Sequence, residues 1–253
     1  KHNGVEVWNG RGIVRDRQTI EVAGEAITAD HLIIATGSRP TMHPIPGLQE
    51  AVASGAVVDS TGALSLEKIP ERLVVVGGGV IGIEFAALFS AVGSEVIVLE
   101  KFSILNGLDR EVQGQMRRIL RRAGVQVFEE ADVQRFEGST VVVQVGGEQH
   151  RFTGDAVLVS LGRTPNLDAV ASLDLELERG GIKTDHQMQT SIPGVYAIGD
   201  VNGKQMLAHT ASAEGIAAVE NILGNPTHVD YHKIPACVYS FPEIAVVGLT
   251  EEE

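Results

Sequence analysis

Two kinds of apolar pattern recur along the chain. Continuous apolar runs fill predicted strands at residues 32–35, 73–76 and 156–160, as is typical of parallel strands buried on both faces. Apolar residues at helical spacing predict helices over 80–92 and 109–123, each followed by a glycine, and a third over 206–223. A strand at 95–100 follows the first helix, which makes a right-handed β-α-β unit. The pattern therefore predicts an α/β fold.

Other segments show the shorter alternation of half-buried strands. Residues 5–8 and 19–22 alternate between apolar and polar positions, and Asn and Gly separate them. This predicts an antiparallel meander over residues 5–27. Short strands are expected again between 125 and 145, and the Pro- and Gly-rich stretch 40–47 is expected to be a loop.

The chain contains an internal repeat. Residues 30–40 (DHLIIATGSRP) and 155–165 (DAVLVSLGRTP) carry Asp, Gly and Pro at the same offsets around an apolar run. A repeat of this length predicts two related nucleotide-binding domains, although two buried strands can also resemble each other by accident. We expect one domain from residues 1–68 and 190–225, a second from 69–189, and the start of a third from 226–253.

Composition narrows the class of protein. The 253 residues carry a net charge of −13, which argues against broad nucleic-acid binding. No apolar run is long enough to span a bilayer, and no signal-peptide pattern opens the sequence, so we expect a cytoplasmic protein. Cys237 is the single cysteine, which excludes an internal disulfide and predicts a small buried side chain. The histidines show no metal-ligand spacing, and no metal site is expected.

A glycine-rich turn is the clearest candidate site. Gly77, Gly79 and Gly82 have the spacing Gly-x-Gly-x-x-Gly between a predicted strand and a predicted helix, with Val80 and Ile81 between the last two glycines. Such a turn lets a pyrophosphate approach the backbone and the free N–H groups of the helix. Glu100 ends the next strand, where a carboxylate accepts ribose hydroxyls and repels a 2′-phosphate. The turn therefore predicts a site for NAD rather than NADP.

Three further polar residues have a functional and a plainer interpretation. Glu84 lies shortly after the glycine turn, where an acidic residue can simply complement the helix dipole. Asp200 ends a predicted strand, where side chains of α/β folds face the ligand crevice, but turns also favour Asp. A histidine at the position of His209, near the start of the last helix, is more often a capping or core residue than a catalytic one.

These segments together resemble the pyridine nucleotide–disulfide oxidoreductases, and most closely the members that oxidise dihydrolipoamide. The resemblance runs in the family's order over nearly the whole chain and identifies it as an internal fragment. The matching stretches are IIATGSRP (33–40), STGAL (60–64), VVGGGVIGIEFA (75–86), LGRTPN (161–166), VYAIGDV (195–201), LAHTASAEG (207–215) and IPACVYSFPEIAVVG (234–248).

The resemblance implies two Rossmann-like domains, a discontinuous one for FAD and an inserted one for NAD, followed by the first strands of a dimerisation domain. It places a set of residues near each cofactor. The NAD set is Gly77, Gly79, Val80, Ile81, Gly82, Glu84, Glu100, Val133 and Gly162, with Glu84 beside the nicotinamide. The FAD set is Thr36, Gly37, Ser60, Thr61, Asp200, Met206, Leu207, Ala208 and His209.

Several parts of the family pattern have no match in this sequence. These are a first Gly-x-Gly-x-x-Gly, the Cys-x4-Cys redox pair, a lysine beside the flavin, and the His-Glu acid/base pair. The parent enzyme is expected to pass electrons from dihydrolipoamide through a disulfide and FAD to NAD⁺, whereas the fragment alone is expected to be inactive. Expected partners are lipoamide on a carrier domain, a second copy in a homodimer, and a 2-oxo acid dehydrogenase or glycine cleavage complex. A mercuric or glutathione-type reductase, or a free-standing NADH-binding module, is the alternative.

Overall fold

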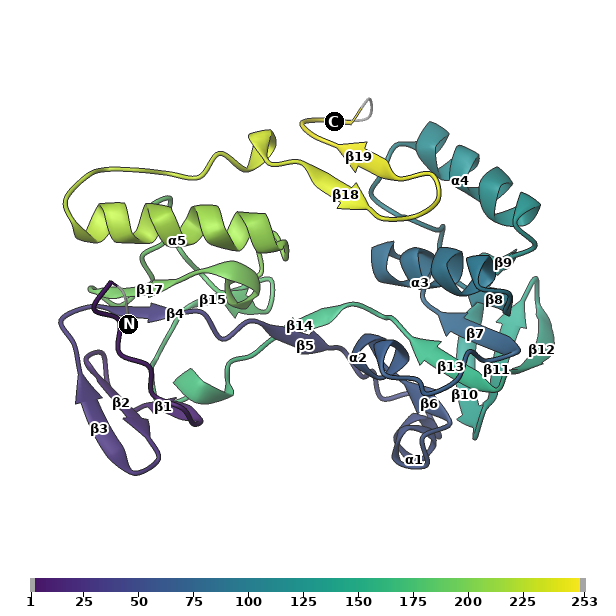
Figure 1. The fold of residues 1–253 in the computed structure, drawn as a ribbon, viewed down its shortest axis with the longest axis horizontal. Helices are drawn as coiled ribbons and strands as arrows, with labels where there is room; N and C mark the ends of the chain where they lie inside the picture. The colour runs from purple at the N-terminus through teal and green to yellow at the C-terminus, as the bar shows by residue number, and fades with distance from the viewer. Residues whose placement is uncertain (1–2, 251–253) are drawn as a thin grey trace. The chain divides into compact units, whose positions relative to one another are not determined.

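The computed structural model describes residues 3–250, and their contacts divide the chain into two compact units (Figure 1). The first unit contains Lys1–Arg39 and Arg163–Ile234, and the second contains Pro40–Gly162 and Pro235–Glu253. These limits differ from the expected division after residues 68 and 189. A strand at residues 57–58 joins the sheet of the second unit, and residues 163–189 make their contacts within the first unit. The assignment of each domain to one cofactor stays a prediction.

The second unit is built on a five-stranded parallel sheet. Its strands, in spatial order, are β6 (Val57–Val58), β13 (Ala156–Val159), β7 (Arg72–Val76), β8 (Glu95–Leu99) and β9 (Gln126–Phe128). Val74 lies opposite Val157 and Ile97 in parallel register. The side chains of β7 from Leu73 to Val75 are completely buried, as the continuous apolar runs predicted. The predicted parallel α/β sheet is confirmed.

Each face of this sheet packs against a different layer. Leu73, Val75 and Leu158 belong to a core shared with the helices α3 (Val80–Ala91) and α4 (Arg110–Arg122). Val74 and Val76, on the opposite face, pack against an antiparallel sheet of β10 (Asp132–Glu137), β11 (Thr140–Val145) and β12 (Glu148–Thr153). The strand residues alternate between the two cores because successive side chains point to opposite faces.

The helices of the second unit follow the predicted spacing. The first long helix buries Ile83, Ala86 and Phe89, and the second buries Gln113, Met116 and Leu120. The predicted helices over 80–92 and 109–123 are thus confirmed. Two short helices were not predicted: α1 (Leu48–Ala53) and α2 (Ser60–Leu64). The hairpin of β18 (Ala236–Val238) and β19 (Ile244–Val246) lies in the segment 226–253, where the resemblance implied strands. Val238 of this hairpin belongs to the same buried core as the apolar side chains of α3 and α4.

The first unit combines a meander, small sheets and one long helix. The meander is β1 (Gly12–Val14), β2 (Thr19–Val22) and β3 (Glu25–Thr28). The strand β4 (Leu32–Ile34) pairs in parallel with β17 (Val195–Ala197), and α5 (Ala208–Ile222) packs on them (Figure 1). The remaining elements are β5 (Ser38–Pro40), β14 (Arg163–Pro165), β15 (Leu177–Glu178), β16 (Gly181–Ile182) and three 3-10 turns at Asp168–Val170, Gly199–Asn202 and Tyr231–Lys233.

The prediction of a strand at residues 5–8 was wrong. This segment is irregular, and its apolar side chains are largely exposed: Val5 by 58%, Val7 by 70% and Trp8 by 45%. The meander instead begins at Gly12, whose strand pairs with β2. Alternation alone does not make a strand, because an extended segment also needs a partner for its backbone groups, and none of the described strands pairs with residues 5–8.

The two copies of the sequence repeat adopt the same local structure. Each copy forms a buried parallel strand, β4 or β13, and continues through a glycine with positive φ into a short strand, β5 or β14. The φ angles are 68° at Gly37 and 99° at Gly162, a backbone region that favours glycine. The repeat in the sequence is therefore also a repeat of a strand, a left-handed glycine and a second strand.

The start of α3 crosses β7 at close range, and Gly82 allows this crossing. A Cβ atom on Gly82 would lie 1.9 Å from the carbonyl oxygen of Gly77. We expect Gly82→Ala to lower the free energy of unfolding of the chain by about 3 kcal/mol, because backbone has to move to admit the methyl group. Urea denaturation measures this change.

Gly114→Ala is the matched control for this prediction. Gly114 lies inside α4, where an added Cβ would meet only the end of the Arg118 side chain at 3.8 Å. Alanine is the better helix former, so we expect a gain of about 0.5–1 kcal/mol. Equal stability of the Gly82→Ala variant and the wild type would contradict the steric argument.

Candidate functional site

The turn between β7 and α3 depends on glycine at its first position. Gly77 has φ of 106°, and a Cβ atom there would lie 2.4 Å from the carbonyl oxygen of Ser160. Its N–H group donates to the carbonyl of Leu99 at 2.9 Å, which ties the turn to the end of β8. The first glycine of the motif therefore serves both the turn and the close approach of β13.

Gly78 is held from both sides, although the motif leaves its position free. Its N–H donates to Oε2 of Glu100 at 2.6 Å, and its carbonyl accepts from the N–H of Leu105 at 2.8 Å. A Cβ atom on Gly78 would meet Cγ2 of Ile104 at 2.9 Å and Cβ of Glu100 at 3.0 Å. Sequence reasoning missed this requirement, because it assigned Glu100 to a ribose and not to a backbone amide, and because Ile104 and Leu105 come from a loop with no recognisable motif.

Gly79 faces open space. It is the N-cap of α3 with an ordinary extended backbone, φ −71°, and no atom lies within 4 Å of the place where a Cβ would be. The N–H groups of the first turn of α3 begin at this point, and they carry the positive end of the helix dipole. Gly79 therefore leaves a cradle in front of a helix N-terminus, which is the geometry that binds phosphate groups.

This cradle is one wall of a pocket of about 590 Å³ in the second unit. Of the residues predicted for NAD, five line it: Gly77, Gly79, Glu100, Val133 and Gly162. Val80, Ile81, Gly82 and Glu84 are not among its lining residues. The other lining residues are His43, Ile45, Val76, Leu99, Lys101, Phe102, Ala131, Asp132, Ser160 and Leu161.

The carboxylate of Glu100 is fixed by two backbone groups. Its Oε2 accepts from Gly78, and its Oε1 accepts from the N–H of Phe102 at 2.8 Å. Each carboxylate oxygen has two lone pairs, so acceptor capacity remains on both. Glu100 is thereby oriented at the wall of the pocket and can still accept hydrogen bonds from two hydroxyl groups.

An ion pair also lies at the wall of this pocket. Lys101 Nζ is 2.9 Å from Oδ1 of Asp132, and the hydrogen bond from this ammonium group lowers the pKa of the Asp132 carboxyl below its ordinary value. The side chains of both residues are more than half exposed. The ammonium group of Lys101, the residue after Glu100, is therefore paired with a carboxylate that lines the same pocket.

A second ion pair supports the loop that covers Gly78. Oε1 of Glu129 accepts from the N–H of Ile104 at 2.8 Å, and Arg117 donates to both oxygens of this carboxylate. Burial acts to raise the pKa of Glu129, but the hydrogen bonds from Arg117 and Ile104 together lower it. Sequence reasoning did not single out Glu129, since nothing in its own segment signals a distant backbone partner.

Glu84 contacts the C-terminal hairpin. It is the fifth residue of α3, beyond the first turn, so it does not act as a first-turn acid. Its Oε1 accepts from the backbone N–H of Tyr239 at 2.8 Å. The place expected for it beside a nicotinamide stays a prediction.

Predicted flavin residues of the first unit gather where β4 and β17 end. Thr36 and Gly37 follow β4, and Asp200 follows the neighbouring parallel strand β17, so the carboxyl ends of the two strands meet. Oδ2 of Asp200 accepts from the hydroxyl of Ser38 at 2.5 Å, and Arg163 Nε lies 3.8 Å from the same oxygen. The side chain of Asp200 is about a quarter exposed.

The remaining predicted flavin residues occupy two helix starts. Leu207 is the N-cap of α5, with Met206 before it and the exposed Ala208 and His209 in its first turn. Ser60 and Thr61 open α2 in the second unit, where the side chain of Asp59 caps the helix by accepting from the N–H of Gly62. The FAD set is therefore divided between the two units.

A buried carboxylate supports the Asp200 turn. Glu214 on α5 is completely buried, and its two oxygens accept from the N–H of Gly199 at 2.5 Å and from the hydroxyl of Tyr231 at 2.7 Å. Burial, and then the hydrogen bond and charge of Glu214, raise the pKa of the Tyr231 phenol. Sequence reasoning missed Glu214. An acidic residue on the buried face of a helix, between Thr210 and Ala217, was the available signal.

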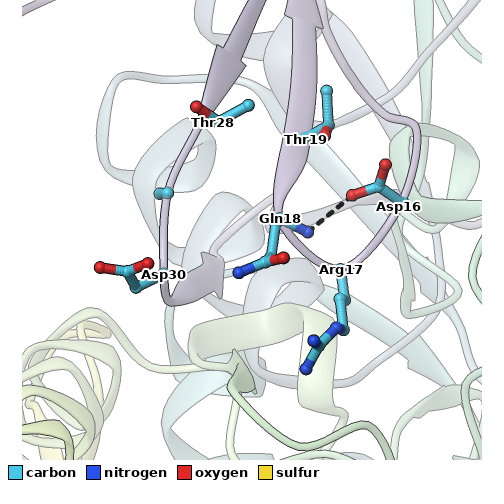
Figure 2. A pocket seen from close by; sticks show the side chains of 7 residues that line it. Asp16, Arg17, Gln18, Thr19, Thr28 and Asp30 are labelled. Carbon is cyan, nitrogen blue, oxygen red and sulfur yellow. Dashed lines mark hydrogen bonds between the residues drawn. The ribbon is translucent and has the colours of Figure 1, made fainter.

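A separate polar hollow of about 530 Å³ lies at the end of the meander (Figure 2). Figure 2 shows Asp16, Arg17 and Asp30 around it, with Oδ1 of Asp16 accepting from the N–H of Gln18 at 2.8 Å. None of the predicted site residues lines this hollow. Within residues 3–250, no group of three His, Cys, Asp or Glu side chains could hold a metal ion. No helix in the same residues is long and apolar enough to cross a membrane.

Comparisons with known proteins give one consistent result. Residues 1–215 match the family model described as pyridine nucleotide-disulphide oxidoreductase. The chain is 43% identical over 252 residues to a dihydrolipoyl dehydrogenase of Mycoplasma pneumoniae, covering 98% of this chain and 55% of that protein. It is 42% identical over 224 residues to a dihydrolipoyl dehydrogenase of Acholeplasma laidlawii, covering 88% of this chain and 67% of that protein.

The fold is similar to that of a solved flavoprotein. The HOCl-induced flavoprotein disulfide reductase RclA of Escherichia coli superimposes with a TM-score of 0.87 at 30% identity, over 98% of this chain and 58% of that chain. The chain thus spans little more than half the length of the Mycoplasma relative and of this structure.

Gly79→Ala tests the cradle without disturbing the fold. Its backbone suits alanine and the added methyl meets no atom beyond the neighbouring residues of the chain, so we expect the free energy of unfolding to fall by at most about 1 kcal/mol, the cost of alanine at an N-cap. The methyl group would occupy the cradle, and we expect NADH affinity to fall on the order of tenfold, as for the loss of one good contact. Titration of NADH fluorescence measures this, with Gly114→Ala as the control. Unchanged affinity would place the nucleotide elsewhere.

Tyr231→Phe tests the support of the Asp200 turn. The substitution leaves one oxygen of the buried Glu214 without its donor, so we expect a loss of about 2 kcal/mol in the free energy of unfolding. Tyr239→Phe is the matched control, because Tyr239 is 71% exposed and should change the stability by less than about 0.5 kcal/mol. Urea denaturation compares the two variants, and equal stability would contradict a supporting role for the hydroxyl.

Proposed function

Because the chain belongs to the pyridine nucleotide–disulphide oxidoreductase family, we propose that it carries the NAD site and part of the FAD site of a dihydrolipoamide dehydrogenase. The observation that carries the proposal is the pocket in front of α3, where a glycine cradle and a fixed carboxylate lie on one wall. The dihydrolipoyl dehydrogenases that the chain resembles support the substrate class.

The residues at the pocket fit an NAD molecule. The cradle at Gly79 is the space that a Cβ would otherwise fill, and the N–H groups of α3 would hold the pyrophosphate there. The Glu100 carboxylate would accept hydrogen bonds from the two ribose hydroxyls through its remaining lone pairs. Val133 and Gly162, which also line the pocket, would contact the nucleotide as well. We assign Glu84 to the nicotinamide end by family analogy, and Val80, Ile81 and Gly82 to the NAD site as part of the glycine turn and the start of α3.

The residues of the first unit fit part of an FAD molecule. Asp200 would accept hydrogen bonds from the ribityl chain, while Thr36 and Gly37 would lie by the nucleotide at the same strand ends. The segment from Met206 to His209 would lie by the flavin at the start of α5. Ser60 and Thr61, which open α2 in the second unit, are assigned to FAD by family analogy alone. When bound, FAD and NAD supply the electron and hydride transfer, and the protein positions them. The sequence contains a single Gly-x-Gly-x-x-Gly match, so these residues are a partial set.

The proposal includes the context of the whole protein. Its substrate would be lipoamide carried on a partner domain, within a 2-oxo acid dehydrogenase or glycine cleavage complex, and it would act as a cytoplasmic homodimer. The first alternative is a different disulfide reductase of the family, of mercuric or glutathione type, which the likeness to a flavoprotein disulfide reductase favours. A free-standing NADH-binding module is the second alternative.

A substrate comparison tests the proposal in the full-length polypeptide. We expect NADH oxidation to depend on lipoamide and not on oxidised glutathione or mercuric ion, with NADH preferred to NADPH because Glu100 repels a 2′-phosphate. The absorbance of NADH measures the rate, and a flavin spectrum of the purified protein reports FAD. Turnover of glutathione or mercuric ion would identify the first alternative, and NADH binding without flavin would identify the second.

The 253-residue chain on its own gives the complementary result. We expect it to bind NADH, because the pocket lies within the second unit, and to lack lipoamide turnover, because Cys237 is its single cysteine. Sustained NADH-dependent reduction of lipoamide by this chain would contradict the expectation that it carries the NAD site without the redox cysteines.

A further inference from the structure

We propose that Asp132 strengthens the preference for NAD over NADP by occupying the ammonium group of Lys101. The inference rests on the proposed NAD site, and it adds a residue that the glycine motif and its closing acid do not include. Lys101 directly follows Glu100, where a free cation would attract the 2′-phosphate that distinguishes NADP. The structure pairs this cation with a carboxylate of the same pocket.

The backbone brings the two charges together. Glu100 and Lys101 follow the end of β8, and Asp132 is the first residue of β10. The carbonyl of Glu100 accepts from the N–H of Ala131 at 2.9 Å. Lys101 directly follows Glu100 and Asp132 directly follows Ala131, so this hydrogen bond brings the two charged residues next to each other. The resulting distance from Lys101 Nζ to Oδ1 of Asp132 is 2.9 Å. The pair is therefore built into the way the two strands meet.

A third side chain orients the carboxylate. Gln134 donates through Nε2 to Oδ2 of Asp132 at 2.7 Å and to its backbone carbonyl at 3.1 Å. With Oδ2 engaged by Gln134, Oδ1 is directed at the ammonium group. Asp132 is thus held in the position in which it neutralises Lys101.

The charges that line the pocket explain how this pairing can affect the binding of a phosphate group. Among the described residues that line it, Glu100 and Asp132 are negative and Lys101 is the one lysine or arginine. With Lys101 paired, the wall presents an excess of negative charge to a bound nucleotide. A phosphate group of charge about −2 is repelled there, whereas a hydroxyl is not. Without Asp132, Lys101 would be released beside the same position.

The expected size of the effect follows from the exposure of the pair. The side chains of Lys101 and Asp132 are 62% and 52% exposed, so water screens their charges. Exposed pairs of this kind correspond to changes of roughly two- to fivefold in an equilibrium constant. We therefore expect Asp132→Asn to raise the affinity for NADPH relative to NADH by roughly two- to fivefold, and high salt to reduce this change.

The experiment measures the dissociation constants of NADH and NADPH in the full-length protein by fluorescence titration. Four proteins form a double-mutant cycle: wild type, Asp132→Asn, Lys101→Gln and the double variant. We expect Asp132→Asn to shift the ratio of the two constants toward NADPH in the wild-type background and to have no effect when Lys101 is absent. Glu137→Gln is the matched control. Glu137 lies on β10, as Asp132 does, and forms an exposed ion pair with Arg151 of β12, but it does not line the pocket.

Each outcome decides one of the two claims. A shift of the ratio in Asp132→Asn that disappears without Lys101 supports the inference. An unmoved ratio, a shift equal to that of Glu137→Gln, or a shift that persists in the Lys101→Gln background overturns it while NADH binding stays intact. Failure of the wild type to bind NADH would overturn the proposed function itself, and this inference with it.

Discussion

The hydrogen bond from the Gly78 N–H to Glu100 is the interaction on which the second unit's site depends. It joins the turn after β7 to the residue after β8, two points that the parallel sheet brings to the same edge. The 2.6 Å contact fixes the path of the backbone in front of α3 and, at the same time, the direction of the carboxylate. Leu105 holds the opposite side of the same peptide, and Glu129 in turn holds Ile104. The turn beside the pocket is therefore held by two carboxylate-to-amide hydrogen bonds and one backbone hydrogen bond.

The first unit uses the same device at another strand end. Glu214 accepts from the N–H of Gly199, directly before Asp200, as Glu100 accepts from Gly78. In both places a carboxylate satisfies the amide of a glycine in a tight turn after a parallel strand. Such charge-assisted bonds to backbone groups are stronger than neutral ones, and a buried carboxylate requires them. Two sites with different predicted ligands thus share one solution for holding a turn.

The sequence predicted the elements whose signal is local. The apolar runs at 73–76 and 156–160 became buried parallel strands, and the glycine spacing placed Gly77, Gly79 and Glu100 on one pocket wall. What it missed depends on partners far along the chain. Gly78, Glu129 and Glu214 matter through hydrogen bonds to partners 22, 25 and 15 positions away along the chain, and the strand expected at residues 5–8 lacks a partner among the described strands. The sequence pattern of one segment does not predict which distant segment it will pair with.

The pairing of β4 with β17 has a consequence for the order of synthesis. Residues 40–162 leave the ribosome after β4 but before β17, and they contain all five strands of the parallel sheet of the second unit. Domains generally fold as units while the chain is still being made. The second unit can therefore complete its parallel sheet during translation, while β4 must remain without its neighbour until residues 195–197 emerge. In the growing chain, β4 is therefore made before the strands of the parallel sheet of the second unit but is paired after them.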